Sequence, residues 1–221
     1  SCAIEKEYTM SDSTDFFNNY YAGKEHAFGK VPNQRMREFV LKENIGGNAL
    51  DLGCGDGRNS LFLAEIGMKV IAVDQSKEGI EQLNKNALQH GLDQNVETFV
   101  DDVRNFVVPR NFFDLISAVT IFDHFPEGYL DSFLGEIHDG LKENGILFVK
   151  VHTVDNPCYN GDSGQASELS KAIQHYFDND ELNRILKDKF DILDYEEYKI
   201  TDHTHGEPHQ HAFAEAVARK K

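Results

Sequence analysis

The feature that most constrains this chain is a glycine-rich run between an apolar strand and an apolar helix. Ala49–Leu52 is predicted to be a short strand, Gly53, Gly55 and Gly57 follow at alternate positions, and 58–66 has apolar residues at helical spacing. Glycines lack a Cβ, so the backbone can turn sharply and approach a ligand closely. The free N–H groups that begin the helix favour a carboxylate or phosphate. The run therefore predicts a ligand with an anionic group at a strand–turn–helix junction.

An acidic residue at the end of the next strand is the second constraint. The apolar segment Val70–Val73 ends in Asp74, roughly 20 residues beyond the glycine turn. A carboxylate at this place accepts hydrogen bonds from ribose hydroxyls. The glycine turn and Asp74 together predict an adenosine-type cofactor across the tips of the strands.

The spacing of the glycines favours one cofactor class over another. The dinucleotide fingerprint is G-x-G-x-x-G, whereas this chain has Gly-x-Gly-x-Gly with Asp51 inside the preceding strand. A carboxylate facing the turn repels a pyrophosphate and attracts an ammonium group. S-adenosylmethionine (SAM) carries an ammonium, a carboxylate and a cationic sulfonium, so it fits both features. A turn that binds no ligand is the alternative.

The run Leu50–Gly57, with the sequence LDLGCGDG, resembles the first motif of the class I SAM-dependent methyltransferases. The resemblance extends from about residue 45 to about residue 200, and it implies SAM as cofactor and methyl transfer as activity. By the pattern of this class, Asp51, Gly53, Gly55, Asp74 and Asp102 would contact SAM. The full set of residues predicted to bind the cofactor also includes Cys54, Gly57, Arg58, Gln75, Val103 and Val119.

The alternation of strands and helices predicts a Rossmann-like α/β fold. We expect a seven-stranded, mostly parallel sheet with a C-terminal antiparallel hairpin and helices on both faces. The predicted strands are Ala49–Leu52, Val70–Val73, Val96–Val100, Phe113–Val119, Ile146–Val151, Phe190–Lys199 and Ala212–Ala218. The predicted helices include Asp15–Tyr21, Gln34–Lys42, Lys77–His90, Glu127–Leu141, Ala166–Tyr176 and Glu181–Lys187.

At 221 residues, the chain is predicted to be a single domain. Residues 1–9 show no periodicity before Met10, so we interpret them as a remnant or an alternative start. Residues 10–45 are predicted to form an N-terminal helical lid. The aromatic segment 20–29 either folds over the cofactor or packs the two N-terminal helices together.

Two later strand ends complete the predicted cofactor site. Asp102 followed by Val103 suits an adenine amino group and ring, unless these residues are simply a solvated loop. The strand order reverses beside the fourth strand, and ligands bind at such switch points. We therefore expect 117–121 to line the methionine end of SAM.

The histidines are the second functional signal. His124, His152 and His209 are candidate general bases, although His124 also fits a structural cap of the next helix. The segment 203–211 is predicted to be a histidine-rich hairpin that converges with His152 and Cys158 over the sulfonium. It has three interpretations: a substrate pocket, a metal site, or a solvated hairpin without a role. Its spacing matches no zinc motif, so no metal is predicted.

A narrower resemblance rests on two segments. The run 51–61, which includes Arg58-Asn59-Ser60, and the ending 213–221 are similar to the tellurite-resistance methyltransferase family. The resemblance implies a small cytoplasmic enzyme that methylates a soft small-molecule or metalloid oxyanion acceptor. The histidine-rich hairpin departs from that family.

Composition excludes several partners. The formal net charge of −16 argues against nucleic acids and anionic membranes, since both need a basic surface. We find no apolar run near the roughly 20 residues of a membrane span and no signal peptide. The chain has 3 cysteines, one inside the glycine turn, so we expect no disulfide framework and a cytoplasmic location. A small-molecule substrate is expected, and the oligomeric state is left open.

The predicted reaction is an in-line attack of the acceptor lone pair on the SAM methyl group. A soft nucleophile needs little help from a base, whereas a hydroxyl or ammonium acceptor must lose a proton. Two other function classes fit the fold. One is an NAD(P)-dependent oxidoreductase, against which the glycine spacing and the lack of a Tyr-x-x-x-Lys pair argue. The other is a non-catalytic module that binds SAM or its demethylated product.

Overall fold

The computed structural model describes residues 10–23, 29–126, 128–157, 159, 172–202 and 209–221. Strands of these residues form one seven-stranded sheet in the order β3-β2-β1-β4-β5-β7-β6. The strands are β1 (Asn48–Leu52), β2 (Lys69–Asp74), β3 (Val96–Val100), β4 (Phe113–Val119), β5 (Leu141–His152), β6 (Phe190–Asp202) and β7 (His209–Lys220).

The topology confirms the predicted fold. Strands β1 to β5 run parallel to one another, and β7 is antiparallel to both β5 and β6. The strand β6 therefore runs in the same direction as β1, and its carboxyl end reaches the same edge of the sheet. The order reverses between β1 and β4, which makes their carboxyl ends the switch point where ligands bind in open α/β sheets.

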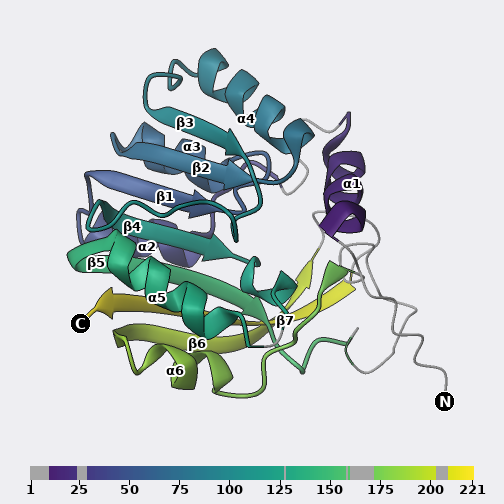
Figure 1. Ribbon diagram of the computed structural model, residues 1–221, viewed down its shortest axis with the longest axis vertical. Helices are drawn as coiled ribbons and strands as arrows, with labels where there is room; N and C mark the ends of the chain where they lie inside the picture. Colours follow the sequence, from purple (N-terminus) through teal and green to yellow (C-terminus); the bar gives the residue numbers. More distant parts are fainter. Residues whose placement is uncertain (1–9, 24–28, 127, 158, 160–171, 203–208) are drawn as a thin grey trace.

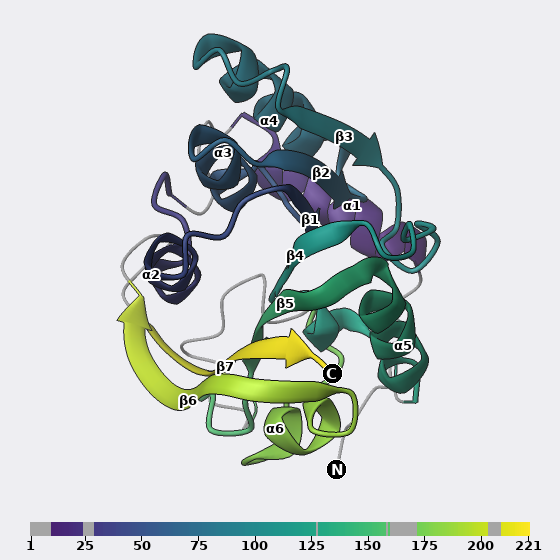
Figure 2. The same ribbon diagram turned by 90° about the vertical axis from the view of Figure 1, so that its left-hand side faces the viewer.

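Helices cover both faces of the sheet (Figure 2). Helices α2, α3 and α4 pack on one face, and α5 and α6 pack on the other. In Figure 1, α1 stands across the carboxyl ends of the strands. The helices are α1 (Met10–Tyr21), α2 (Gln34–Lys42), α3 (Arg58–Glu65), α4 (Lys77–Gln89), the 3-10 helix η1 (Phe122–His124), α5 (Leu130–Gly140) and α6 (Glu181–Leu186).

The two faces of the central strands supply two separate cores. In β1, Leu50 and Leu52 face α5, while Ala49 packs with α2 and α3. The fully buried side chains include Phe113 and Phe148 on neighbouring strands. Burial on both faces explains why these strands are nearly continuous apolar runs in the sequence.

Several predicted elements differ from the structure, and three of the differences are large. The helix expected at Glu127–Leu141 begins at Leu130, and its last predicted residue already starts β5. The strand expected at Ile146–Val151 begins at Leu141 instead, with an irregularity where Asn144 has a φ of 62°. Of the helix expected at Ala166–Tyr176, 166–171 lie outside the described residues and 173–176 are irregular. The hydrophobic pattern predicted a helix there, but backbone hydrogen bonds join the segment to η1 and β5 instead of closing helical turns.

Candidate active site

The glycine turn lies between β1 and α3, as the sequence predicts. Gly53, Gly55 and Gly57 have φ values of 67°, 56° and 90°, which side chains with a Cβ rarely adopt. Helix α3 begins at Arg58, and Gly57 gives it no side-chain cap. The first N–H groups of α3 are therefore not capped by its N-cap side chain, an arrangement suited to an anionic group.

Asp51 lies beneath this turn in β1 and is 1% exposed. Ser60 of α3 donates a hydrogen bond from Oγ to Asp51 Oδ2 over 2.6 Å. Burial raises the pKa of Asp51 to about 6, although the Ser60 hydroxyl and the charge of Arg58 act in the opposite direction. A buried carboxylate with this pKa gains from a cation placed nearby.

Asp74 holds the turn from the end of β2. Its Oδ2 accepts the Gly55 N–H and its Oδ1 accepts the Ser76 N–H, both over 2.8 Å. Burial raises the pKa of Asp74 to about 6, against the lowering by these two N–H groups. The sequence predicted an acid at this place but not its second task, which is to fix the backbone of the turn. We call Asp51, 53–57 and Asp74 the glycine site.

Helix α1 packs directly on the glycine site. Gln75 exchanges side-chain hydrogen bonds with Ser13 and Thr14, at 3.0 and 2.9 Å. The Ser76 hydroxyl donates to Asn18 Oδ1 over 3.1 Å. Tyr21 is buried against the turn, where a Cβ on Gly55 would stand 2.3 Å from its hydroxyl oxygen. Helix α1 of the predicted lid thus covers the turn, whereas α2 packs on a face of the sheet and forms no lid; 24–28 lie outside the described residues.

The predicted adenine contact has a partner that the sequence did not reveal. Arg104 binds Asp102 through Nε at 2.9 Å and Nη2 at 2.5 Å. Burial raises the pKa of Asp102, but the Arg104 hydrogen bonds outweigh it, and the net direction is downward. Val103 is buried beside this pair. An adenine amino group would therefore share the Asp102 carboxylate with Arg104.

The end of β4 lies at the switch point. Val119 is buried, and Thr120 donates its N–H to the Lys150 carbonyl of β5 over 2.8 Å. Thr120 has a φ of 52°, an uncommon conformation for a β-branched residue. Ile121 packs on the glycine turn, since a Cβ on Gly53 would meet its Cδ1 at 2.7 Å. Non-glycine residues in this conformation often occur at functional sites.

The three candidate bases have different surroundings. His152, at the tip of β5, lies with Nδ1 2.8 Å from Asp123 Oδ2. His124 Nδ1 lies 2.7 Å from the Ala172 carbonyl, its ring meets Phe17 edge-on, and burial lowers its pKa. These contacts favour the structural interpretation of His124. The His209 side chain lies outside the described residues, as do Cys158 and 203–208, so their roles remain predictions.

Aromatic rings from two segments surround His152. The centroids of the Phe213, His211 and Tyr176 rings lie 4.7, 5.6 and 6.3 Å from that of His152. Asp123 is fully buried, and the His152 side chain is 13% exposed. We call Asp123, His152, Tyr176, His211 and Phe213 the histidine site. Of the histidines expected to converge, the structure brings His152 and His211 together.

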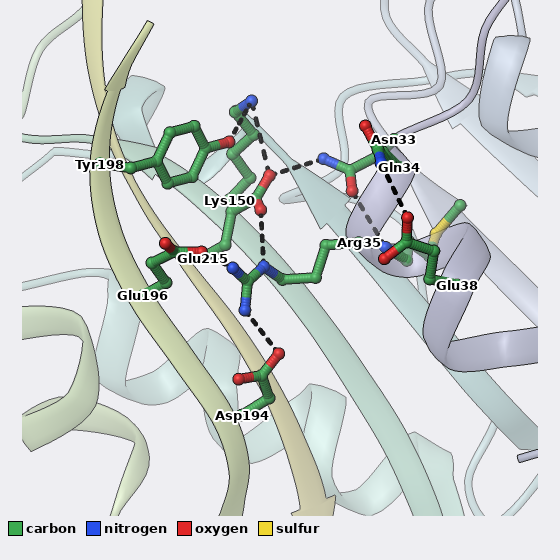
Figure 3. A network of polar contacts seen from close by, with 10 residues as sticks. Asn33, Gln34, Arg35, Glu38, Lys150, Asp194, Glu196, Tyr198 and Glu215 are labelled. Atoms are coloured by element: carbon green, nitrogen blue, oxygen red, sulfur yellow. Dashed lines mark hydrogen bonds and ion pairs between the residues drawn. The ribbon is translucent and has the colours of Figure 1, made fainter. Parts of the chain in front are cut away.

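A polar network anchors β7 to α2 (Figure 3). Glu215 is 3% exposed and accepts hydrogen bonds from Asn33 Nδ2 at 2.7 Å and Arg35 Nε at 3.1 Å. Lys150 Nζ lies 3.5 Å from Glu215, 3.0 Å from the Tyr198 hydroxyl and 3.8 Å from the Phe213 ring centroid. The network thus reaches the floor of the histidine site. No short-range pattern in the sequence links these positions.

The described ranges, with their gaps at the histidine-rich hairpin, contain no group of three potential ligands that could hold a metal ion. None of the helices in the part of the chain that the structure describes combines the length and the apolar character needed to cross a membrane.

Two groups of residues thus meet at the carboxyl edge of the sheet. One is a turn suited to an amino acid and a nucleoside, and the other is an imidazole held by a carboxylate.

Comparisons with known proteins agree with this geometry. Residues 49–145 match a family described as a methyltransferase domain. The probable S-adenosyl-L-methionine-dependent methyltransferase TehB of Haemophilus influenzae is 26% identical over 96% of this chain and 72% of its own length. A methyltransferase of 2-heptyl-1-hydroxyquinolin-4(1H)-one from Mycobacteroides abscessus is 26% identical over 69% of this chain and 68% of its own. The crystal structure of TehB superposes with a TM-score of 0.71 at 22% identity, covering 93% of this chain and 67% of that one.

Proposed function

We propose that the chain, whose residues 49–145 match a methyltransferase domain, is a class I SAM-dependent methyltransferase that transfers a methyl group from SAM to a small-molecule acceptor. The observation that carries the proposal is the glycine site. Asp74 holds the Gly55 N–H, and the uncapped start of α3 lies beside two buried carboxylates with raised pKa values. This set of groups suits an amino acid joined to a nucleoside.

The residues of the glycine site fit SAM chemically. The turn and the start of α3 suit the SAM carboxylate, and Asp51 suits its ammonium group. Asp74 and Gln75 are proposed for the ribose, Asp102 and Val103 for adenine, and Val119 for the methionine end. Cys54, Gly57 and Arg58 complete the turn and the helix start. When bound, SAM supplies an activated methyl group and its leaving group, so the protein positions the acceptor and excludes water.

Two acceptor classes have support. Similarity to TehB supports a soft or metalloid acceptor, of the kind that the tellurite-resistance family implies. The His152–Asp123 pair supports an acceptor that loses a proton, and so does the relative named for a hydroxyquinolinone. The net charge of −16 disfavours bulky anionic substrates in both classes.

Calorimetric titration of the purified chain with SAM and, separately, with NADH tests the cofactor. We expect micromolar binding of SAM and no heat with NADH. Heat with NADH alone would indicate that the glycine site binds a nicotinamide cofactor and that the protein is an oxidoreductase. Heat with neither ligand would overturn the proposal.

Turnover then separates an enzyme from a non-catalytic binding module. S-adenosylhomocysteine release is measured with tellurite, selenite, small thiols and simple phenols as acceptors. We expect release that depends on one acceptor class. Tight binding of SAM without release over the whole panel would favour the binding module.

A further inference from the structure

The structure contains a carboxylate–imidazole pair that methyl transfer to a soft acceptor does not need. Resting on the function proposed above, we propose that Asp123 positions His152 as a general base, and that the acceptor is a planar molecule with an acidic hydroxyl. No residue of the glycine site takes part in removing the proton from the acceptor. In this proposal, only residues of the histidine site do so.

Asp123 holds both the backbone and the ring of His152. Its Oδ1 accepts the His152 backbone N–H over 2.9 Å, and its Oδ2 lies 2.8 Å from Nδ1. A fully buried carboxylate next to Nδ1 favours a proton on that nitrogen. The lone pair is then on Nε2, which has no hydrogen-bond partner within the described part of the chain. An imidazole in this state accepts protons.

Asp123 itself is fixed by the segment that follows β5. Its carbonyl oxygen accepts the N–H groups of Gln174 and His175, at 2.8 and 3.0 Å. Phe177 donates its N–H to the His152 carbonyl over 2.9 Å. The segment 174–177 therefore binds both members of the pair. Such support keeps the orientation of a base constant during catalysis.

The rings around His152 favour a planar acceptor. Phe213 and His211 lie on β7, and Tyr176 lies on the segment after β5, all with centroids within 6.3 Å of the His152 ring. Aromatic side chains stack on flat rings and supply contact area without a full charge. Asn156 Nδ2 lies 3.3 Å from His211 Nδ1 and orients this second imidazole.

The proton and electron balance is complete without a further reactant. As the acceptor oxygen attacks the methyl carbon, its proton passes to His152 Nε2, the O–C bond forms and the C–S bond breaks. The positive charge of the sulfonium disappears, and the imidazolium carries it next to the Asp123 carboxylate. Water then takes the proton from the partly exposed ring. A soft anion has no proton to lose and would gain nothing from the pair.

The first test needs no acceptor. In 15N-labelled protein, long-range 15N–1H spectra of the histidine rings identify the neutral tautomer directly. We expect His152 in the Nδ1–H form, and the Nε2–H form in Asp123→Asn. Calorimetry should show unchanged SAM affinity in this variant. An Nε2–H tautomer in the unmodified protein, or loss of SAM binding in Asp123→Asn, would overturn the role of Asp123.

The second test follows the proton itself. We would titrate 4-nitrophenol into the protein saturated with S-adenosylhomocysteine, in slightly acidic buffer, and record the phenolate absorption. Binding should produce phenolate with the unmodified protein, and His152→Gln and Asp123→Asn should abolish it. His138→Gln and Asp139→Asn at the end of α5 are matched controls and should behave like the unmodified protein. Binding as neutral phenol, or no binding, would overturn the acceptor class.

Turnover gives the third measurement. We expect His152→Gln and Asp123→Asn to lower kcat with phenol acceptors by about 10²- to 10⁴-fold, with little change in the KM for SAM. Equal turnover of phenols by the variants would refute the base. Failure of SAM to bind the unmodified protein would refute the proposed function instead, so the two failures are distinguishable.

Discussion

The glycine site and the histidine site lie at the same edge of one sheet, but they are built differently. In the glycine site, most hydrogen bonds join residues close in sequence, such as Ser60 to Asp51 and Ser76 to Asp74. In the histidine site, Asp123 meets His152 from another strand end, and His211 comes from the C-terminal hairpin. One site depends on a local segment, and the other depends on how the sheet assembles.

This difference separates binding from chemistry. The glycine site is made from the consecutive elements β1, α3 and β2, so few contacts between distant parts of the chain are needed to form it. A site made at the ends of β4, β5 and β7 changes with any residue on those strands. We therefore expect mutations beside the histidine site to lower stability and leave SAM affinity unchanged. Mutations in the glycine site should lower SAM affinity and leave the protein folded.

The largest effect is expected from Glu215→Ala. The change leaves Arg35 and Lys150 without their buried carboxylate, and breaking such a group costs about 3–5 kcal/mol. Urea unfolding should show this loss, while SAM binds with unchanged affinity under native conditions. Glu196→Ala is the control, because that Arg35 partner is largely exposed and should cost less than about 1 kcal/mol. Equal losses in both variants would contradict the anchoring role of Glu215.

Asp74→Ala should lower SAM affinity and leave the protein folded, in contrast to Glu215→Ala. It removes the acceptor of the Gly55 and Ser76 N–H groups and the proposed ribose contact. We expect SAM affinity to fall about 100-fold, or about 2.7 kcal/mol, with a cooperative unfolding transition retained. Asp93→Ala, at an exposed position, is the calorimetric control. Undiminished affinity would remove Asp74 from the cofactor site.

The same contrast explains what the sequence revealed. The alternation of apolar segments predicted the strands and the mostly parallel sheet, and the glycines with Asp74 located the turn, because these signals are local. The pairing of Asp123 with His152 was not predictable, since an acid in an Asp-His-Phe run also fits a helix cap. Arg104 on Asp102 was missed because the two residues only pair after the loop bends. Glu215 gave no signal, as its partners lie on α2, β5 and β6.

A smaller effect is expected from pH. Asp51 and Asp74 have pKa values of about 6 in the free protein because they are buried, and SAM binding favours their ionised forms. SAM affinity should be constant above about pH 7 and fall up to tenfold for each carboxylate per pH unit below about 6. The stability of the free protein changes in the opposite direction, because folding raises both pKa values above 3.8. The contribution of these two carboxyls to the free energy of unfolding therefore rises as pH falls from 6 towards 3.8. Calorimetry in buffers of different ionisation enthalpy should detect proton release on binding, and a flat profile would exclude both residues.

The smallest expected effect concerns Thr120, which joins the two sites at the end of β4. At a φ of 52°, a β-branched residue is strained by on the order of 1 kcal/mol. Thr120→Gly relieves this strain but raises the conformational entropy of the unfolded chain. Thermal unfolding should therefore show that the free energy of unfolding rises by at most about 1 kcal/mol. Asn144→Gly, at a φ of 62° in the irregular part of β5, is the matched control, and asparagine tolerates that conformation better. If the Thr120 backbone holds the acceptor against the methyl donor, Thr120→Gly lowers turnover while Asn144→Gly does not. Equal turnover in both variants would mean that the strain is local and that the two sites are joined by the sheet alone.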